Sequence, residues 1–269
     1  MIFDGKAFAK SRLAALHEER KSFGSLSLGI VVASNDPVTS SYVKIKERNA
    51  HALAVELVRY HLAPGATTED AVALVHEAAQ KNDGVIVQLP LPSGIDASVV
   101  VNAMPCTKDV DVISEEAAAL FAAGKHVVMP PVASAINEII DAHNIAVEGK
   151  RAVVVGKGKL VGIPAEHLLR MRGADVVALD HGDDLATHTT GADIIVLGAG
   201  SPQLLQPDMV KDGVVIFDAG TSESGGAIVG DADPTVAAKA SFFTPVPGGI
   251  GPVAVVEIFA NLLALKARV

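Results

Sequence analysis

Short apolar runs, rich in β-branched residues, alternate with longer segments whose apolar positions repeat every three or four residues. A helical segment is expected first, over residues 4–23. Strand-like runs then occur over 26–33, 57–62 and 84–88, separated by helical segments over 41–55 and 67–81. Strands that alternate with helices predict βαβ units, and these units predict a parallel sheet with right-handed crossovers.

The same alternation returns in the second half of the chain. Strand-like runs are expected over 151–155, 175–179, 193–197, 214–217 and 241–243, after a helical segment over 132–143. A last helix, over 252–267, is apolar enough to dock onto either half. We therefore expect an α/β fold with two domains. The N-terminal domain covers 1–130 and is completed by the closing helix at 252–269, and the second domain covers 131–251.

A glycine motif marks the start of the second domain. The strand over 151–155 runs directly into Gly156, Gly158 and Gly162, and a segment of helical spacing follows. Gly156 permits a tight turn, Gly158 lets the backbone approach a pyrophosphate, and the helix directs its N-terminal amides at that charge. An ordinary turn remains an open alternative. The pattern favours a Rossmann-type nucleotide-binding domain over 131–251.

The composition narrows the class of protein. The 269 residues are 49% hydrophobic and only 4% aromatic, with no tryptophan, which suits an aliphatic core of helices over a parallel sheet. The formal net charge of −9 argues against a nucleic-acid partner. The single cysteine, Cys106, excludes an intrachain disulfide and is more easily explained as a structural residue than as a nucleophile. We assign no metal ligands.

The chain also lacks the patterns of membrane insertion and secretion. The longest apolar runs are shorter than the about 18 residues that a membrane span needs. The N-terminus has no charged segment followed by an apolar one, so we expect no signal peptide and a cytoplasmic location.

Three polar residues are expected at the carboxyl edge of the first sheet. Tyr42 and Lys46 are four residues apart on a predicted helix and therefore share one of its faces. Gln88 ends the strand over 84–88 at the same edge. A lysine near apolar walls can have its pKa lowered towards the range of a general base. A solvated lysine beside a surface tyrosine is the open alternative.

Two further segments are candidates for ligand contacts. In an extended segment, Asp109 and Asp111 would lie on the same side, where one carboxylate could accept hydrogen bonds from a heterocycle. A merely solvated loop is the alternative. Residues 245–252 hold three prolines and three glycines, which predict a rigid, shaped loop. A domain hinge and a surface for a flat ligand both remain open.

These pieces together resemble the methylenetetrahydrofolate dehydrogenase/methenyltetrahydrofolate cyclohydrolase family over essentially the whole chain. The resemblance depends on the motifs SSYVKIK at 40–46, GVIVQLPLP at 84–92, KDVD at 108–111, VVGKGKLVGIP at 154–164, GD at 230–231 and TPVPGGIGP at 244–252. It implies two domains with a cleft between them, a closing helix that returns to the N-terminal domain, and a homodimer.

The resemblance also implies an activity in one-carbon metabolism and purine biosynthesis. It implies oxidation of 5,10-methylenetetrahydrofolate with NAD or NADP, followed by hydrolysis of the methenyl product to 10-formyltetrahydrofolate. Lys46 is then the central catalytic residue, Tyr42 stacks near the folate and assists, Gln88 positions Lys46, and Asp111 anchors the pterin. The loop residues Pro247, Gly248 and Gly249 are implied substrate contacts.

Several positions depart from the usual pattern of this family. Val112 stands where a glycine is usual, Lys157 where the glycine turn commonly has arginine, and Thr221 where the family has isoleucine. Residues 130–135 read PPVASA in place of a PCTP-x-G run. Two alternatives therefore stay open: a monofunctional NAD-dependent dehydrogenase and a non-catalytic folate- or nucleotide-binding paralogue.

The choice of nucleotide depends on opposing features of the second domain. We assign to cofactor binding Gly156, Lys157, Gly158, Lys159, Asp180, Gly198 and Thr221. Asp180 follows a strand, 24 residues after Gly156, close to the spacing of the acid that binds a ribose 2′-hydroxyl. Lys157 and Lys159 could instead meet the 2′-phosphate of NADP. We favour NAD because the strand fixes the place of the acid, whereas a lysine is mobile.

Overall fold

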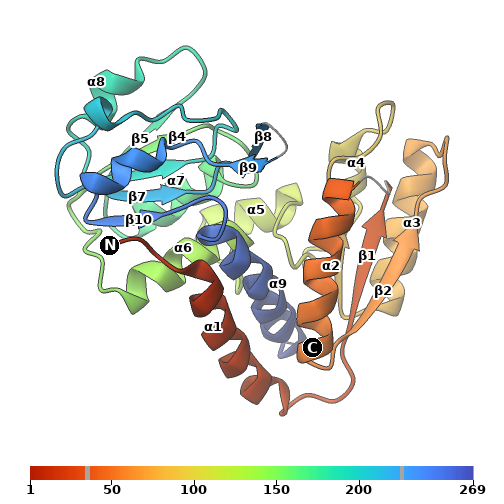
Figure 1. Cartoon of the computed structure of the whole chain (residues 1–269). Coiled ribbons are helices and arrows are strands. Elements are labelled where there is room, and N and C mark those ends of the chain that lie inside the picture. Colours follow the sequence, from red (N-terminus) through yellow and green to blue (C-terminus); the bar gives the residue numbers. More distant parts are fainter. Residues whose placement is uncertain (34–36, 225–226, 269) are drawn as a thin grey trace. The chain divides into compact units, whose positions relative to one another are not determined.

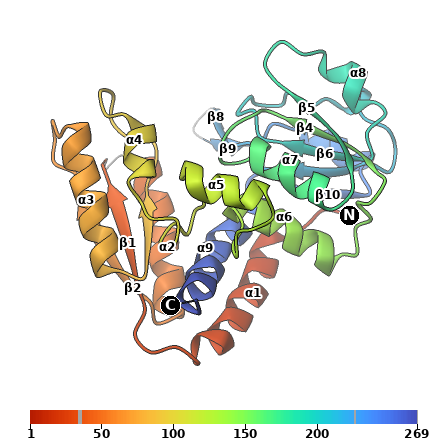
Figure 2. The same cartoon turned by 180° about the vertical axis from the view of Figure 1, so that it is seen from behind.

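The computed structural model describes residues 1–33, 37–224 and 227–268, and gives only the backbone for 37–42 and 224. The chain divides into two compact units. The Lys46 unit comprises Ser11–Pro131 and Val255–Val269, and the Gly156 unit comprises Met1–Lys10 and Val132–Ala254. Figures 1 and 2 show the elements of each unit from opposite sides. The expected α/β fold with two parallel sheets is confirmed.

The Lys46 unit is built on a parallel sheet of strand order β2-β1-β3. The strands are β1 (Ser27–Val32), β2 (Glu56–His61) and β3 (Gly84–Val87). Its helices include α2 (Pro37–Ala52), α3 (Thr68–Lys81), α4 (Ala97–Asn102) and α5 (Glu115–Ala122). The runs of β1 and β3 are buried along nearly their whole length because helices cover the sheet. α3 and α4 pack side by side (Figures 1 and 2).

The Gly156 unit contains a larger parallel sheet of strand order β10-β7-β6-β4-β5. Its strands are β4 (Arg151–Val155), β5 (Asp175–Leu179), β6 (Ile194–Leu197), β7 (Val215–Asp218) and β10 (Phe242–Thr244). Its other elements are α6 (Pro131–Ala142), α7 (Gly162–Met171), α8 (Leu185–Thr189), the 3-10 turns η1 (Pro207–Met209) and η2 (Pro234–Ala238), and the antiparallel hairpin β8 (Ser222–Ser224) and β9 (Ala227–Val229). In this order β5 lies on one side of β4, and β6 and β7 lie on the other. The strand order therefore reverses at β4, as it does at the ligand-binding crevice of a nucleotide-binding sheet.

The division into units falls within α1 (Gly5–Arg20), after the first residue of α6, and within α9 (Ile250–Lys266). The sequence placed residues 1–10 with the first domain, but the backbone of Phe3 donates to Phe243 O at 2.9 Å, which attaches this segment to β10. The second part of α9 is attached within the Lys46 unit. There, Asn261 Nδ2 donates to Val110 O and Met129 O, each at 2.8 Å.

The limits of most expected elements shift by only a few residues. The helix expected over 41–55 begins at Pro37 and ends at Ala52. Proline is well suited to the first turn of a helix, since its missing N–H would have no partner there. Ala54 has a positive φ of 49°, which ends the helix before residue 55. The hairpin β8–β9 and the 3-10 turns were not expected because such short elements carry almost no periodic pattern.

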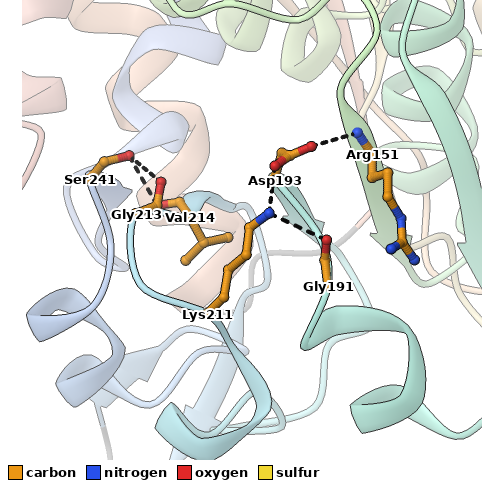
Figure 3. Close-up of polar contacts among 7 residues, drawn as sticks. All are labelled: Arg151, Gly191, Asp193, Lys211, Gly213, Val214 and Ser241. Atoms are coloured by element: carbon orange, nitrogen blue, oxygen red, sulfur yellow. Dashed lines mark hydrogen bonds and ion pairs between the residues drawn. The ribbon is translucent and has the colours of Figure 1, made fainter.

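Polar contacts close the amino edge of the large sheet (Figure 3). Asp193, just before β6, accepts hydrogen bonds from the backbone of Arg151 at 2.9 Å and from Lys211 Nζ at 2.5 Å. The bond to Lys211 lowers the pKa of Asp193 below its usual value. Ser241 Oγ donates to Gly213 O at 2.8 Å. These side chains stabilise the end of the sheet opposite to the glycine motif, so the carboxyl edge is the one left for ligands.

Candidate active site

Lys46 and Gln88 form the centre of the candidate site. Lys46 lies on α2, is 7% exposed, and donates from Nζ to Gln88 Oε1 at 2.7 Å. Gln88 follows β3, where its backbone N–H donates to Val31 O at 2.9 Å. Its side-chain Nε2 donates to Leu89 O at 3.0 Å. Because the amide nitrogen is held by Leu89, the amide oxygen is fixed towards the lysine.

The electrostatics of this site favour proton transfer. Burial lowers the pKa of Lys46, and the negative charge of Asp111 acts in the opposite direction. Burial raises the pKa of Asp111 to about 6, Lys46 opposes this rise, and Asp109 adds to it. A lysine with a lowered pKa has a larger neutral fraction near neutral pH, so it can accept a proton as well as donate one.

The segment around Asp109 and Asp111 is a turn, so the expectation of an extended segment with both carboxylates on one side was wrong. Asp109 is fully buried, and its Oδ2 accepts bonds from Ser114 Oγ at 2.7 Å, Ser114 N at 2.8 Å and Ile113 N at 3.0 Å. Asp109 therefore stabilises the loop to which it belongs. Asp111 is the carboxylate whose charge acts on Lys46. Spacing could not separate these roles, since both residues belong to one four-residue motif.

Val112, next to Asp111, has a left-handed backbone with a φ of 55°. This conformation is costly for a β-branched residue, and Val112 is also buried at 2% exposure. The departure from glycine at this position, visible in the sequence, thus coincides with a backbone that favours glycine.

Tyr42 lies on α2 one turn before Lys46, but its side chain is outside the described part of the structure. Its stacking role stays a prediction. Cys106 is partly buried, and burial together with Glu116 raises the pKa of its thiol. A raised pKa disfavours the thiolate, which agrees with a structural cysteine.

The glycine turn has the shape that a nucleotide needs. Gly156 has a φ of 95°, and a Cβ there would lie 2.6 Å from Gly198 O. A Cβ at Gly162 would lie 1.8 Å from Gly156 O, so the helix packs directly against the turn. Among the described atoms, nothing lies within 4 Å of a Cβ placed on Gly158. Backbone contacts thus require glycine at positions 156 and 162, while Gly158 leaves open space for a ligand.

Helix α7 supplies a site for an anion beside this turn. In the described structure, its N-cap residue Val161 makes no side-chain hydrogen bond to the helix. In this first turn Ile163 N donates to Gly158 O at 3.1 Å and Pro164 has no N–H, so the positive end of the helix dipole and the remaining amides of the turn are what favour a diphosphate. Lys157 and Lys159 are exposed next to these amides in the chain. The residues present therefore fit a nicotinamide nucleotide.

The remaining predicted nucleotide contacts lie at the carboxyl edge of the same sheet. Gly156 N donates to Leu179 O at 2.9 Å, so the exposed Asp180 follows directly after a residue bonded to the glycine turn. A Cβ at Gly198 would lie 2.4 Å from Val161, which shows how closely this loop approaches the start of α7. Thr221 is exposed after β7.

The loop of Pro247, Gly248 and Gly249 is anchored within the Gly156 unit. Gly248 has a φ of 100°, and its carbonyl accepts a bond from Gly5 N at 2.9 Å. A Cβ at Gly249 would lie 2.5 Å from Pro245 O. The rigidity expected from the prolines and glycines is therefore accompanied by tight backbone packing.

Two buried carboxylates of this unit, Asp218 and Asp231, were given no role in the site from the sequence. Asp218 ends β7, and Asp231 belongs to the GD motif, which only the family resemblance had singled out. Within the described ranges, no group of three or more His, Cys, Asp or Glu side chains could hold a metal ion. None of the helices described is long and apolar enough to cross a membrane.

Comparison with known families agrees with this geometry. Residues 3–111 match the tetrahydrofolate dehydrogenase/cyclohydrolase catalytic domain, and residues 130–269 match the NAD(P)-binding domain of the same family. The chain belongs to the tetrahydrofolate dehydrogenase/cyclohydrolase family. Membership confirms the resemblance found in the sequence, and with it an enzyme with an NAD(P)-binding domain.

Close relatives cover nearly the whole chain. The bifunctional protein FolD of Halothermothrix orenii is 36% identical over 279 residues, covering 99% of this chain and 97% of that protein. The bifunctional protein FolD of Cenarchaeum symbiosum is 37% identical over 268 residues, covering 96% and 95%. Both are named as bifunctional, which supports the dual activity over the monofunctional and non-catalytic alternatives.

Solved structures of the family have the same fold. The bifunctional enzyme of Campylobacter jejuni superposes with a TM-score of 0.95 at 31% identity, covering 100% of this chain and 99% of that one. The Trypanosoma brucei enzyme, complexed with NADP and an inhibitor, gives 0.93 at 29% identity, covering 100% and 97%.

Proposed function

We propose that this enzyme oxidises 5,10-methylenetetrahydrofolate to the 5,10-methenyl form with a nicotinamide nucleotide and hydrolyses that product to 10-formyltetrahydrofolate. Family membership supports both reactions. The observation that carries the proposal is the buried Lys46, bonded to Gln88 and under the charge of Asp111. A buried lysine with a lowered pKa is the acid–base group that the hydrolytic step needs.

Lys46 acts on the proton of the attacking water. As the water oxygen bonds to the one-carbon unit, Lys46 Nζ accepts one proton of the water and returns it to N5 as the carbon–N5 bond breaks. The second proton leaves to solvent as the formyl C=O forms. Gln88 holds Nζ in place through its fixed amide oxygen. Gln88 is therefore a positioning residue, and its value lies in keeping the amine oriented for proton transfer.

Asp111 and the loop residues bind the folate. The carboxylate of Asp111 accepts hydrogen bonds from the N–H groups of the pterin ring, which fixes the reacting carbon relative to Lys46. Tyr42 stacks on the folate and assists. Pro247, Gly248 and Gly249 provide a rigid surface for the flat ring system, since glycine allows close approach.

A nicotinamide nucleotide, when bound, would supply the hydride acceptor for oxidation of the methylene carbon. The chain would hold its diphosphate at Gly156, Gly158 and the N-terminus of α7, with Gly198 and Thr221 at neighbouring strand ends. The chemistry of Asp180 favours NAD over NADP. A carboxylate there accepts bonds from ribose hydroxyls, whereas it repels a 2′-phosphate.

A coupled assay tests the function as a whole. The enzyme is mixed with 5,10-methylenetetrahydrofolate and either NAD or NADP, and the absorbance of the methenyl and reduced nucleotide products is followed together with 10-formyl product. We expect both reactions. Methenyl product that accumulates without 10-formyl product would establish a monofunctional dehydrogenase, and failure of both reactions would establish a binding protein.

We also propose that the enzyme is a homodimer, as the family resemblance implies. Light scattering coupled to size-exclusion chromatography measures the mass in solution, and a mass near 27.6 kDa would contradict the dimer.

A further inference from the structure

Two fully buried aspartates lie beneath the carboxyl edge of the large sheet. Asp218 ends β7 and is 1% exposed, and Asp231 follows β9 and is 0% exposed. Neither residue belongs to the site described above. Buried carboxylates require strong hydrogen-bond partners, so the groups that surround them indicate what they do.

Asp231 gathers successive backbone amides of the loop after β6. Its Oδ2 accepts from Ala199 N at 2.7 Å and Gly200 N at 3.0 Å, and its Oδ1 accepts from Ser201 N at 2.8 Å. Amides that curve around one anion in this way form a nest. The nest is filled by the protein's own carboxylate, so these N–H groups do not remain for the phosphates of a ligand.

Asp218 does the same for the neighbouring turns. Its Oδ1 accepts from Gly220 N at 3.0 Å and Asp231 N at 3.2 Å, and its Oδ2 accepts from Ala232 N at 2.9 Å. Its own backbone N–H donates to Thr244 Oγ1 at 2.8 Å. Asp218 thereby links the loop after β7 to the segment that carries Asp231.

The backbone of the neighbouring loops packs tightly against these two carboxylates. A Cβ at Gly220 would lie 2.1 Å from Asp231 Cγ, and a Cβ at Gly230 would lie 2.1 Å from Asp218 Oδ2. The two carboxylates therefore determine where both loops run, because the backbone packs directly against them.

The buried anion also determines which groups the first loop presents. A trans peptide directs its C=O opposite to its N–H. Since the amides of residues 199–201 point at Asp231, the preceding carbonyls point away from it. Gly198 O accordingly lies close to Gly156, at 2.6 Å from the position of a Cβ there. The Gly198 carbonyl therefore packs on the glycine turn, and by the same peptide geometry we expect the carbonyls of residues 199 and 200 to lie on the outer side of the loop.

The strand order indicates which part of a dinucleotide meets this surface. β5, followed by Asp180, lies on one side of β4, and β6 and β7 lie on the other. A dinucleotide that crosses the sheet at β4 puts its adenosine half on the β5 side and its nicotinamide half on the β6 side. The nicotinamide half carries ribose hydroxyls and a carboxamide, which are donors suited to carbonyl oxygens.

We propose that Asp231, supported by Asp218, is a positioning residue for the nicotinamide half of the nucleotide, because it turns the loop at 198–201 so that its carbonyls face the ligand. The proposal rests on the nucleotide-binding function proposed above. The adenosine half is held by the glycine turn and Asp180 on the β5 side. Gly156 N is fixed there by its own bond to Leu179 O at 2.9 Å, so we expect this half to depend less on the loop than the nicotinamide half does.

Protonation gives the proposal a pH dependence. Burial raises the pKa of Asp218 to about 6, and the charge of Asp231 adds to this rise. Burial also raises the pKa of Asp231, against the effect of its three amides. In the part of the chain that the structure describes, the two carboxylates accept their hydrogen bonds from backbone amides, and the hydroxyl of Thr244 contacts only the backbone of Asp218. Binding of the nicotinamide half should therefore weaken as the pH falls towards about 6, since a protonated carboxyl is a weaker acceptor for amides.

Asp231→Asn tests the proposal, because the new NH2 group must face at least one of the inward amides. We measure the Kd of NADH and of ADP by titration, with Asp212→Asn as a control at an exposed aspartate of the same unit. We expect about tenfold weaker NADH binding and nearly unchanged ADP binding in Asp231→Asn, as for loss of a charge-assisted bond. The control should match wild type. Faster hydrogen exchange at 199–201 should accompany the loss.

Two measurements keep the test decisive if Asp231→Asn fails to fold. Asp218→Asn should weaken NADH binding in the same selective way, and wild-type NADH affinity should be constant near about pH 7.5 and fall as the pH drops through about 6, while ADP affinity stays constant. Equal loss of ADP and NADH binding, or an NADH affinity that neither variants nor pH change, would overturn the proposal. A wild-type enzyme that binds neither NADH nor ADP would instead contradict the proposed function.

Discussion

Lys46 Nζ donates to Gln88 Oε1 at 2.7 Å, and Gln88 Nε2 in turn donates to the carbonyl of Leu89. The amide is thus oriented by the backbone that follows β3, and the lysine is oriented by the amide. This relationship joins the end of a strand to the middle of α2, so a change at either residue alters the orientation of the amine.

Replacing Lys46 by methionine should abolish the cyclohydrolase reaction. Methionine keeps much of the buried volume but cannot exchange protons, and loss of a positioned acid–base group lowers rates about 100- to 10,000-fold. The rate of 10-formyl formation from methenyltetrahydrofolate measures this, and folate should still bind. Lys44→Met, on an exposed position of the same helix, is the control. A variant that keeps more than about a tenth of the rate would show that Lys46 is not the acid–base group.

Asp111→Ala should raise the folate KM strongly and leave the nucleotide KM nearly unchanged. A carboxylate that accepts charge-assisted bonds from the pterin contributes about 1.5–3 kcal/mol. Since the pKa of Asp111 is raised to about 6, wild-type folate affinity should be constant at higher pH and fall as the carboxyl is protonated below about 6.

Steady-state kinetics against pH check both statements about Asp111. The fall in affinity below pH 6 should be absent from Asp111→Ala. Glu69→Ala, at an exposed position of α3, should behave as wild type. Equal damage to folate and nucleotide binding would indicate misfolding rather than loss of a pterin contact.

The backbone at Val112 predicts an inverted order of stability. At ordinary positions alanine is more stable than glycine, but a φ of 55° reverses this order because glycine alone adopts it without strain. The free energy of unfolding of Val112→Gly should therefore be about 1 kcal/mol higher than that of Val112→Ala. Urea titration of the two variants measures this difference. The comparison removes the effect of the lost valine side chain, which both variants share. Alanine proving the more stable would exclude strain at this position.

Asp180 predicts the choice of nucleotide. The wild type should give a higher kcat/KM with NAD than with NADP, and Asp180→Ser should shift that ratio towards NADP by roughly tenfold, because a like charge near the 2′-phosphate is removed. Asp175→Ser, an exposed change at the opposite end of β5, is the matched control. A wild-type preference for NADP would refute the assignment, as would a ratio that Asp180→Ser leaves unchanged.

The sequence by itself determined the sheets, their parallel strands and the residues at their carboxyl ends. Runs such as 151–155 are buried on both faces, so their apolar character appears directly in the sequence. The glycine turn was equally visible, because Gly162 packs against Gly156 within a short stretch of chain and Gly156 has a positive φ of 95°. Lys46 and Gln88 were candidates because the predicted helix and the predicted strand place both residues at the carboxyl edge of the first sheet.

Only the tertiary structure decided which polar groups face one another. Asp109 and Asp111 look alike in the sequence, yet one binds the amides of its own loop and the other acts on Lys46. Asp231 lies 30 or more residues from the amides that it binds. Hydrogen bonds between distant segments depend on how the chain folds back over the sheet, and local periodicity carries no information about that path.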